Sequence, residues 1–242
     1  MTGVQTCALP ICFPVTIRCN RPRILDLWLA SIDRLRKDVG WFPAVVVSER
    51  GDADACADHG VHHIYQQNEP VSFKWNTGVQ WLMEQGVDYV MIVGSDDIVS
   101  NDLMRNILAA AEGGYDVIGV DRLCFYGNIR GRSGLLIPLH QHHMLGVCKT
   151  ISRSVLEPIN GVVCPTGRGA GMDALVSKTI APYVKLTKIV DGLVVDVKSR
   201  RNINKLSYWA AKIKQRLPLE HFYTILSKEE RILLERVNNV VS

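Results

Sequence analysis

The feature that most constrains the fold is an unbroken apolar run, residues 89–93, that ends in Gly94, Ser95 and two adjacent carboxylates, Asp96 and Asp97. The run does not alternate between apolar and polar residues. A strand of this kind has both faces buried, which is typical of the centre of a parallel sheet covered by helices on both sides. The sequence therefore predicts that Asp96 and Asp97 lie at the carboxyl end of a central strand.

Short β-rich runs alternate with longer helical segments in the first half of the chain. Strands are expected at 13–19, 42–48, 61–67 and 88–93, and helices at 21–38, 52–60, 69–86 and 101–114. Pro22 suits a first helical turn, Asn101 an N-cap and Gly86 a C-terminal cap. Strands separated by helices form βαβ units. We therefore expect an α/β fold with a mostly parallel central sheet flanked by helices.

Beyond Gly114 the alternation stops. Longer strands at 115–128 and 142–152 suggest antiparallel additions to the sheet, and a hairpin or paired strands are expected around Asp191 and Gly192. Helices are expected at 152–159 and 172–183, with a loop at 164–171 between them. From about residue 201 the chain is expected to be helical, and residues 227–230 fit a capping box.

The composition is that of a globular protein outside the membrane. Of 242 residues, 47% are hydrophobic and 21% are charged, which is enough to bury a large core. No apolar run approaches the ~20 residues of a membrane-spanning helix. Seven cysteines, an odd number without CxxC pairs, argue against a disulfide framework or a zinc site. A reducing compartment, the cytoplasm, is therefore expected.

The first residues are expected to be foreign to the fold. Residues 1–11 look like a translated sequencing-library adapter, and we exclude 1–12 from fold reasoning, with a natural tail as the alternative. On the adapter interpretation the native start is missing. The predicted domains are then 13–200, which carries the α/β fold, and 201–242, a basic helical extension.

The adjacent carboxylates Asp96 and Asp97 have two interpretations. A solvated turn would tolerate them. However, hard divalent cations prefer carboxylate oxygens, and the strand ends of α/β sheets bind diphosphates. A cation held there would neutralise charge on a departing nucleotide diphosphate.

From Phe13 to about Ser199 the chain resembles the GT-A nucleotide-sugar transferases, most closely the inverting family 2-like group. Residues 15–32 look like the opening strand and helix of that family, and residues 74–100 resemble its asparagine-bearing helix and DxD strand. Here the DxD motif reads Ser95-Asp96-Asp97, with serine at the first acidic position. The resemblance implies inverting transfer from a UDP- or GDP-sugar to a glycan or other hydroxyl acceptor, assisted by Mn or Mg.

The resemblance also implies roles for single residues. Asp97 would be the metal ligand that bridges to the donor diphosphate, and Asp96 would contact the ribose or the water shell of the metal. Asn76 would support this loop at the donor site, although a helix-surface amide is the alternative.

Further donor contacts are implied at the ends of the first two strands. Glu49 and Asp52 follow the second strand, where an acidic side chain often recognises a uracil edge; each could instead be a solvated turn residue. The loop after the first strand would meet the nucleotide through Cys19, Asn20 and Arg21.

An inverting transfer needs a base, because the acceptor hydroxyl loses its proton as it attacks the anomeric carbon. Asp173, at the start of a predicted helix, resembles the acidic motif of the family in its order along the chain. We therefore expect Asp173 to be the base. The alternative is that it only stabilises the helix N-terminus.

Two other features remain open. The glycines of 167–171 lack GxGxxG spacing, so we expect an acceptor-side loop there, in which Arg168 could reach a diphosphate. His140, His142 and His143 form a cluster without a clear motif, and a role at the metal or acceptor is one interpretation.

The basic tail fits an anionic membrane surface or, more commonly, a docked helix with a solvated face. Its basic residues are Lys198, Arg200, Arg201, Lys205, Lys212, Lys214 and Arg216. No nucleic-acid-binding motif accompanies this charge, so nucleic acid is not an expected partner.

Two alternatives to a glycosyltransferase stay open. A nucleotidyltransferase on a similar sheet would need a basic residue at the triphosphate near the first strand, where Arg18, Arg21 and Arg23 lie, although no glycine-rich loop follows. A non-catalytic nucleotide-sugar-binding module would bind the donor without transferring it.

Overall fold

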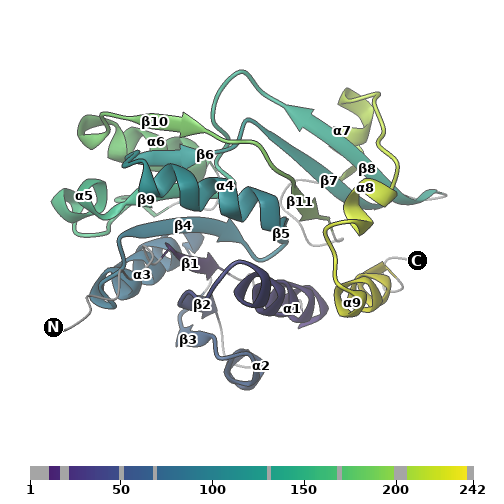
Figure 1. Ribbon diagram of the computed structural model, residues 1–242, viewed down its shortest axis with the longest axis horizontal. Coiled ribbons are helices and arrows are strands. Elements are labelled where there is room, and N and C mark those ends of the chain that lie inside the picture. The colour runs from purple at the N-terminus through teal and green to yellow at the C-terminus, as the bar shows by residue number, and fades with distance from the viewer. Residues whose placement is uncertain are drawn as a thin grey trace, which may run out of the picture.

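The computed structural model describes residues 11–16, 22–48, 52–67, 70–129, 132–167, 171–198 and 206–238. Within these residues, seven strands form a central sheet in the order β10-β6-β9-β4-β1-β2-β3 (Figure 1). Their bounds are β1 Ile11–Thr16, β2 Ala44–Ser48, β3 His62–Tyr65, β4 Tyr89–Gly94, β6 Val117–Gly119, β9 Lys149–Ser152 and β10 Thr187–Ile189. All neighbouring strands are parallel except at β9, which is antiparallel to β4 and β6. The expected mostly parallel sheet is confirmed.

Helices cover both faces of this sheet. On one face, α1 (Pro22–Asp38) and α4 (Asn101–Glu112) pack against Val46 and Met91, and α2 (Ala53–Asp58) adds to the same core. On the other face, α3 (Val71–Glu84), α5 (Arg153–Leu156) and α6 (Met172–Ile180) pack against the alternate residues Val45 and Val90. Because successive residues of β4 enter opposite cores, the apolar run shows no polar alternation, as predicted.

A second, smaller sheet was not anticipated from the sequence. Its order is β5-β11-β7-β8, from β5 (Asp97–Val99), β11 (Val194–Val197), β7 (Arg122–Ile129) and β8 (Arg132–His140). It lies beside the central sheet, next to α8 and α9 (Figure 1). The expected strand at 115–128 is split between β6 and β7, and only the last four residues of 142–152 are a strand.

The expected hairpin around Asp191 and Gly192 is wrong. β10 pairs in parallel with β6 in the central sheet, whereas β11 pairs with β5 and β7 in the second sheet. Gly192, with a φ of +139°, crosses the start of α4, where a Cβ would lie 2.4 Å from Leu103 Cβ. The glycine therefore allows a close crossing between two sheets instead of a reversal of the chain.

The helix boundaries mostly follow the sequence signals. Pro22 begins α1, and Gly86 follows α3 with a φ of +77°. The predicted N-cap Asn101 is wrong, because Ser100 Oγ accepts the bond from the Leu103 backbone N at 3.1 Å. Asn101 instead binds Arg34 and Asp38 with its side chain.

The C-terminal helices are docked onto the α/β fold. They are α7 (Leu206–Lys212), α8 (Glu220–Tyr223) and α9 (Lys228–Asn238), with short 3-10 helices elsewhere at η1 (Glu157–Ile159) and η2 (Ala181–Tyr183). Trp209 of α7 stacks on Phe125 at 4.7 Å, and α9 packs beside α1 (Figure 1). The predicted capping box is present: Glu230 N donates to Ser227 Oγ at 3.1 Å, and Ser227 N donates to Glu230 Oε2 at 2.6 Å. None of the described helices is both long enough and apolar enough to cross a bilayer.

A buried ion pair joins Arg34 of α1 to Glu230 of α9, and the same arginine also binds β5. Arg34 donates from Nε to Glu230 at 2.9 Å and from a terminal nitrogen to the Val99 carbonyl at 2.8 Å, and Glu230 has no exposed surface. Arg34→Met leaves the Glu230 carboxylate buried without the guanidinium that it pairs with. We therefore expect the free energy of unfolding to fall by about 3 kcal/mol. Urea denaturation measures the change.

The exposed pair formed by Arg105 and Asp102 provides a matched control. Arg105→Met should change stability by less than about 1 kcal/mol. Equal effects of the two substitutions would contradict the assignment of the buried pair as the link to α9.

Candidate active site at the carboxyl edge of the sheet

The two adjacent carboxylates lie where the sequence predicted, directly beyond the end of β4. The chain turns over Ser95 and Asp96, and β5 begins at Asp97. Gly94 N donates to Asp97 Oδ2 at 2.7 Å, and a Cβ at Gly94 would lie 2.7 Å from the same oxygen. Glycine at this position therefore allows the backbone to hold the Asp97 carboxylate closely.

A third carboxylate, Asp196 of β11, completes the group. Asp196 stands opposite Asp97 in the antiparallel register of β11 and β5, so both side chains lie on the same face of the second sheet. One ligand oxygen from each of Asp96, Asp97 and Asp196 lies within 4.8 Å of the others. Among the described residues, these three form the group of His, Cys, Asp or Glu side chains with the spacing of a metal site.

Asp196 was not among the predicted site residues. The available signal was an acidic residue inside the apolar run 193–197, between Val195 and Val197, which are both buried. That signal gains meaning only when β11 is known to pair with β5. The motif has Ser95 where the first carboxylate is expected. The fold supplies a third carboxylate from Asp196, which lies far from Ser95 along the chain.

The electrostatics of this group disfavour negative charge on Asp97. Burial raises the pKa of Asp97 well above its usual value, and the charges of Asp196 and Asp96 raise it further. The Gly94 amide and Lys198 oppose this rise without cancelling it. The three carboxylates outnumber the one ammonium group beside them, that of Lys198. Their oxygens are hard donors that could hold Mg²⁺ or Mn²⁺.

Lys198 belongs to this site and not to the exposed basic tail in which the sequence reading placed it. Its side chain is buried, its ammonium binds Asp196 Oδ2, and it lies 5.0 Å from the centre of the Phe125 ring. Lys198 therefore does not contribute its charge to the exposed basic surface of the C-terminal segment.

Asp173 lies in the first turn of α6, which follows Gly171 with a φ of +69°. Its carboxylate lies over Gly146, where a Cβ would be 2.0 Å from Asp173 Cγ. Asp173 is an exposed residue, but partial desolvation raises the pKa of its carboxyl group, and the charge of Lys149 opposes the rise. Asp173 can therefore exchange a proton at a pH closer to neutrality than an ordinary carboxyl group.

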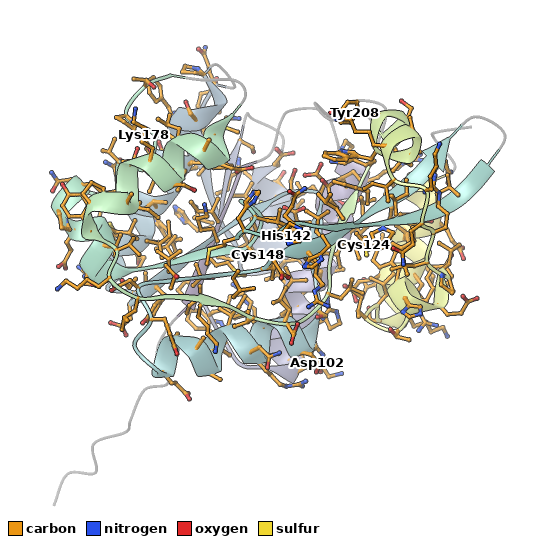
Figure 2. All side chains as sticks on the ribbon, turned by 90° about the horizontal axis from the view of Figure 1, so that it is seen from above. Asp102, Cys124, His142, Cys148, Lys178 and Tyr208 are labelled. Atoms are coloured by element: carbon orange, nitrogen blue, oxygen red, sulfur yellow. The ribbon has the colours of Figure 1, made fainter. Side chains whose placement is uncertain are left out.

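A short segment links Asp173 to the three carboxylates. Lys149 begins β9 and pairs with Ile92 near the end of β4. Burial, and after it the charge of Asp97, raises the pKa of Cys148. The adjacent residue, Lys149, interacts electrostatically with Asp173. Figure 2 shows Cys148 between Lys178 of α6 and Cys124 of β7. The segment 146–149 thus brings both acidic groups to one edge of the sheet.

Asn76 fixes the start of the loop that leads to Asp173. Its Nδ2 donates to the Cys164 carbonyl at 2.8 Å, and the Cys164 N donates to its Oδ1 at 2.8 Å. The side chain is largely buried, so the alternative of an exposed helix-surface amide does not describe it. Its predicted role at the donor stays a prediction.

Asp52 lies at the carboxyl end of β2, in a small polar group. Ser48 Oγ donates to Asp52 Oδ2 at 2.6 Å and lies 2.9 Å from His63 Nε2. The group lies at the same edge of the sheet as the carboxylates, because β1, β2 and β4 are parallel. Five predicted contact residues lie outside the described residues: Cys19, Asn20, Arg21, Glu49 and Arg168.

The histidine cluster has its own surroundings. His140 Nε2 lies 3.1 Å from Asp121 Oδ2, and the rings of His140 and His142 are 6.0 Å apart. His142 and His143 are exposed. These residues do not belong to the group of three carboxylates, and a role at the metal or acceptor stays a prediction.

Comparison with known proteins identifies the fold. No family model and no curated protein matches the chain. Among solved structures, residues 1–349 of S. aureus TarS superpose with a TM-score of 0.54 at 12% identity, covering 78% of this chain and 60% of that one. The chain has the GT-A fold.

The GT-A fold also has nucleotidyltransferase neighbours. 4-Diphosphocytidyl-2C-methyl-D-erythritol synthase from Anaerococcus prevotii DSM 20548 superposes with a TM-score of 0.50 at 11% identity, covering 76% of this chain and 90% of that one. At such identities the likeness concerns the fold alone. This chain spans 60% of the length of the TarS fragment, so the activity and substrates of the whole protein are proposals.

Proposed function

We propose that the chain is a metal-assisted, inverting glycosyltransferase that moves a sugar from a nucleotide-diphosphate donor to a hydroxyl acceptor. The observation that carries the proposal is the group of Asp96, Asp97 and Asp196 at the carboxyl edge of a GT-A sheet. Ligands of open α/β sheets bind at that edge. We also place the reaction in the cytoplasm, since the odd number of cysteines includes four buried free thiols.

The three carboxylates would hold Mn²⁺ or Mg²⁺. When bound, the ion supplies positive charge against the diphosphate that leaves with the nucleotide. Asp97 is the most buried ligand and is held by the Gly94 amide, so it would fix the position of the ion. Lys198 would keep Asp196 oriented toward the same point.

Asp173 would be the base. The acceptor hydroxyl attacks the anomeric carbon, its proton passes to a carboxylate oxygen of Asp173, and the bond to the diphosphate oxygen breaks with its electron pair leaving on the nucleotide. One displacement of this kind inverts the anomeric centre. The raised pKa of Asp173 supports this role because it favours the protonated product of the step.

The nucleotide would lie along the ends of β1 and β2. Asp52 would meet the edge of a uracil or guanine base, supported by Ser48. Cys19, Asn20, Arg21 and Glu49 are proposed to complete this donor contact, with Asn76 behind it. Peripheral membrane contact through the basic C-terminal helices belongs to the same proposal.

A screen of nucleotide sugars by thermal shift, with and without Mn²⁺, tests the proposal on the full chain, which keeps the whole of β1. We expect a UDP- or GDP-sugar to raise the melting temperature, because a ligand that binds only the folded state stabilises it by mass action. The shift should be larger with Mn²⁺. No shift with any donor, together with no effect of Mn²⁺, would overturn the proposal.

A nucleotidyltransferase is the second candidate, since a synthase of that kind shares the fold. It would use the same carboxylates but would take a nucleoside triphosphate and release pyrophosphate. A non-catalytic binding module is the third candidate, and it would bind the donor equally well with or without the Asp173 carboxylate.

A further inference from the structure

Lys149 is a buried cation next to the proposed base. Its side chain is 4% exposed, in a strand whose other residues are also buried. Burying an ammonium group is unfavourable unless it is paired. The pKa of Lys149 is lowered by this burial, while the charge of Asp173 opposes the lowering.

The ammonium is anchored on the same helix face as Asp173. Lys149 Nζ donates to Ser177 Oγ, and Ser177 Oγ donates to the Asp173 carbonyl at 2.9 Å. Asp173 and Ser177 are four residues apart in α6, so they lie on one face. The ammonium is therefore held beside the first turn of α6.

The backbone before Lys149 shapes this contact. Gly146 leaves the space that the Asp173 carboxylate occupies, because a Cβ there would lie 2.0 Å from Cγ. Cys148 has a φ of +55°, which is uncommon for a residue other than glycine. Such a conformation persists only when its surroundings hold it, and it often marks a functional site.

Among the described residues, another titratable group on which the charge of Asp173 acts is the neutral thiol of Cys164. Burial, followed by the charge of Asp173, raises the pKa of Cys164 to about 11. Among the charges described around this carboxylate, that of Lys149 is the one that stabilises its ionised form.

We propose that Lys149 is a positioning residue for the transfer reaction: its ammonium, anchored on Ser177, holds the Asp173 carboxylate ionised over Gly146 and oriented for the acceptor hydroxyl. The inference rests on the proposed function. Lys149 remains an ammonium throughout, and the proton taken from the acceptor passes to Asp173 and then to solvent.

The test compares the pH dependence of transfer in the wild type and in Lys149→Met. Loss of the positive charge raises the pKa of Asp173, so the acidic limb of kcat/KM should move to higher pH. Transfer on that limb should fall by roughly tenfold, with little change at alkaline pH and an unchanged donor-induced thermal shift. Lys149→Arg should restore much of the profile, and Ser177→Ala, which keeps the charge, should change it less.

A uniform loss at all pH values, without rescue by arginine, would overturn the inference. A ¹³C NMR titration of the Asp173 carboxyl in wild type and variant gives a readout that needs no activity. If the wild type transfers no sugar, the proposed function has failed; if the Asp173 midpoint is the same in both proteins, this inference has failed. Lys149→Gln provides a second variant should the methionine form not fold.

Discussion

Replacing Asp173 with asparagine is expected to lower the rate of sugar transfer by roughly 10²- to 10⁴-fold, the usual contribution of a general base. The amide has nearly the same shape, so it should fit over Gly146 but cannot accept the acceptor proton. Initial-rate assays of wild type and Asp173→Asn measure the effect. Donor binding, read as a thermal shift, should be retained.

Asp58→Asn is the matched control, because Asp58 is an exposed carboxylate of α2, which packs on the opposite face of the sheet from α6. Its transfer rate should equal that of the wild type. If Asp173→Asn kept most of its activity, the role of Asp173 would be only to stabilise the N-terminus of α6 with its charge. If it lost donor binding as well, its role would be structural.

Asp97→Asn is expected to abolish the response to Mn²⁺ and yet to stabilise the metal-free protein. The folded-state pKa of Asp97 is raised, so the folded protein binds more protons than the unfolded chain as pH rises above the unfolded value. Stability therefore falls as pH rises through the folded pKa, and the loss is complete above it. A neutral amide removes that loss, and each kcal/mol relieved should raise Tm by about 2–4 °C.

Thermal unfolding at several pH values, with and without Mn²⁺, checks this prediction. Asp102→Asn, at an exposed carboxylate, should change neither the metal-free Tm nor the Mn²⁺ response. A lower metal-free Tm for Asp97→Asn, or an undiminished Mn²⁺ shift, would contradict the assigned electrostatics of the site.

Local sequence signals predicted the central part of the fold. The run 89–93 has two buried faces because Met91 and Ile92 enter different cores, and that pattern is visible without any structure. The helical period of α1 is equally local, and its predicted inward residues Trp28 and Ile32 are buried. Asp96 and Asp97 were placed correctly because they depend only on where one strand ends.

The features that were missed depend on contacts between distant segments. Asp196 joins Asp97 only through the pairing of β11 with β5, about a hundred residues apart along the chain. Lys198 was predicted to lie in a solvated tail, but the pairing of β11 with the distant β7 leaves it buried over the Phe125 ring. Ser100 replaces Asn101 as the cap because Arg34 and Asp38 bind the asparagine side chain. Spacing along the sequence cannot choose among such partners.

The phosphate product released in the presence of Mn²⁺ distinguishes a glycosyltransferase from a nucleotidyltransferase, and phosphate analysis of the reaction mixture identifies it. We expect nucleoside diphosphate from a nucleotide sugar and an acceptor glycan, and we expect Asp97→Asn to lose this release. Release of pyrophosphate from a nucleoside triphosphate, with no nucleoside diphosphate from any nucleotide sugar, would contradict it.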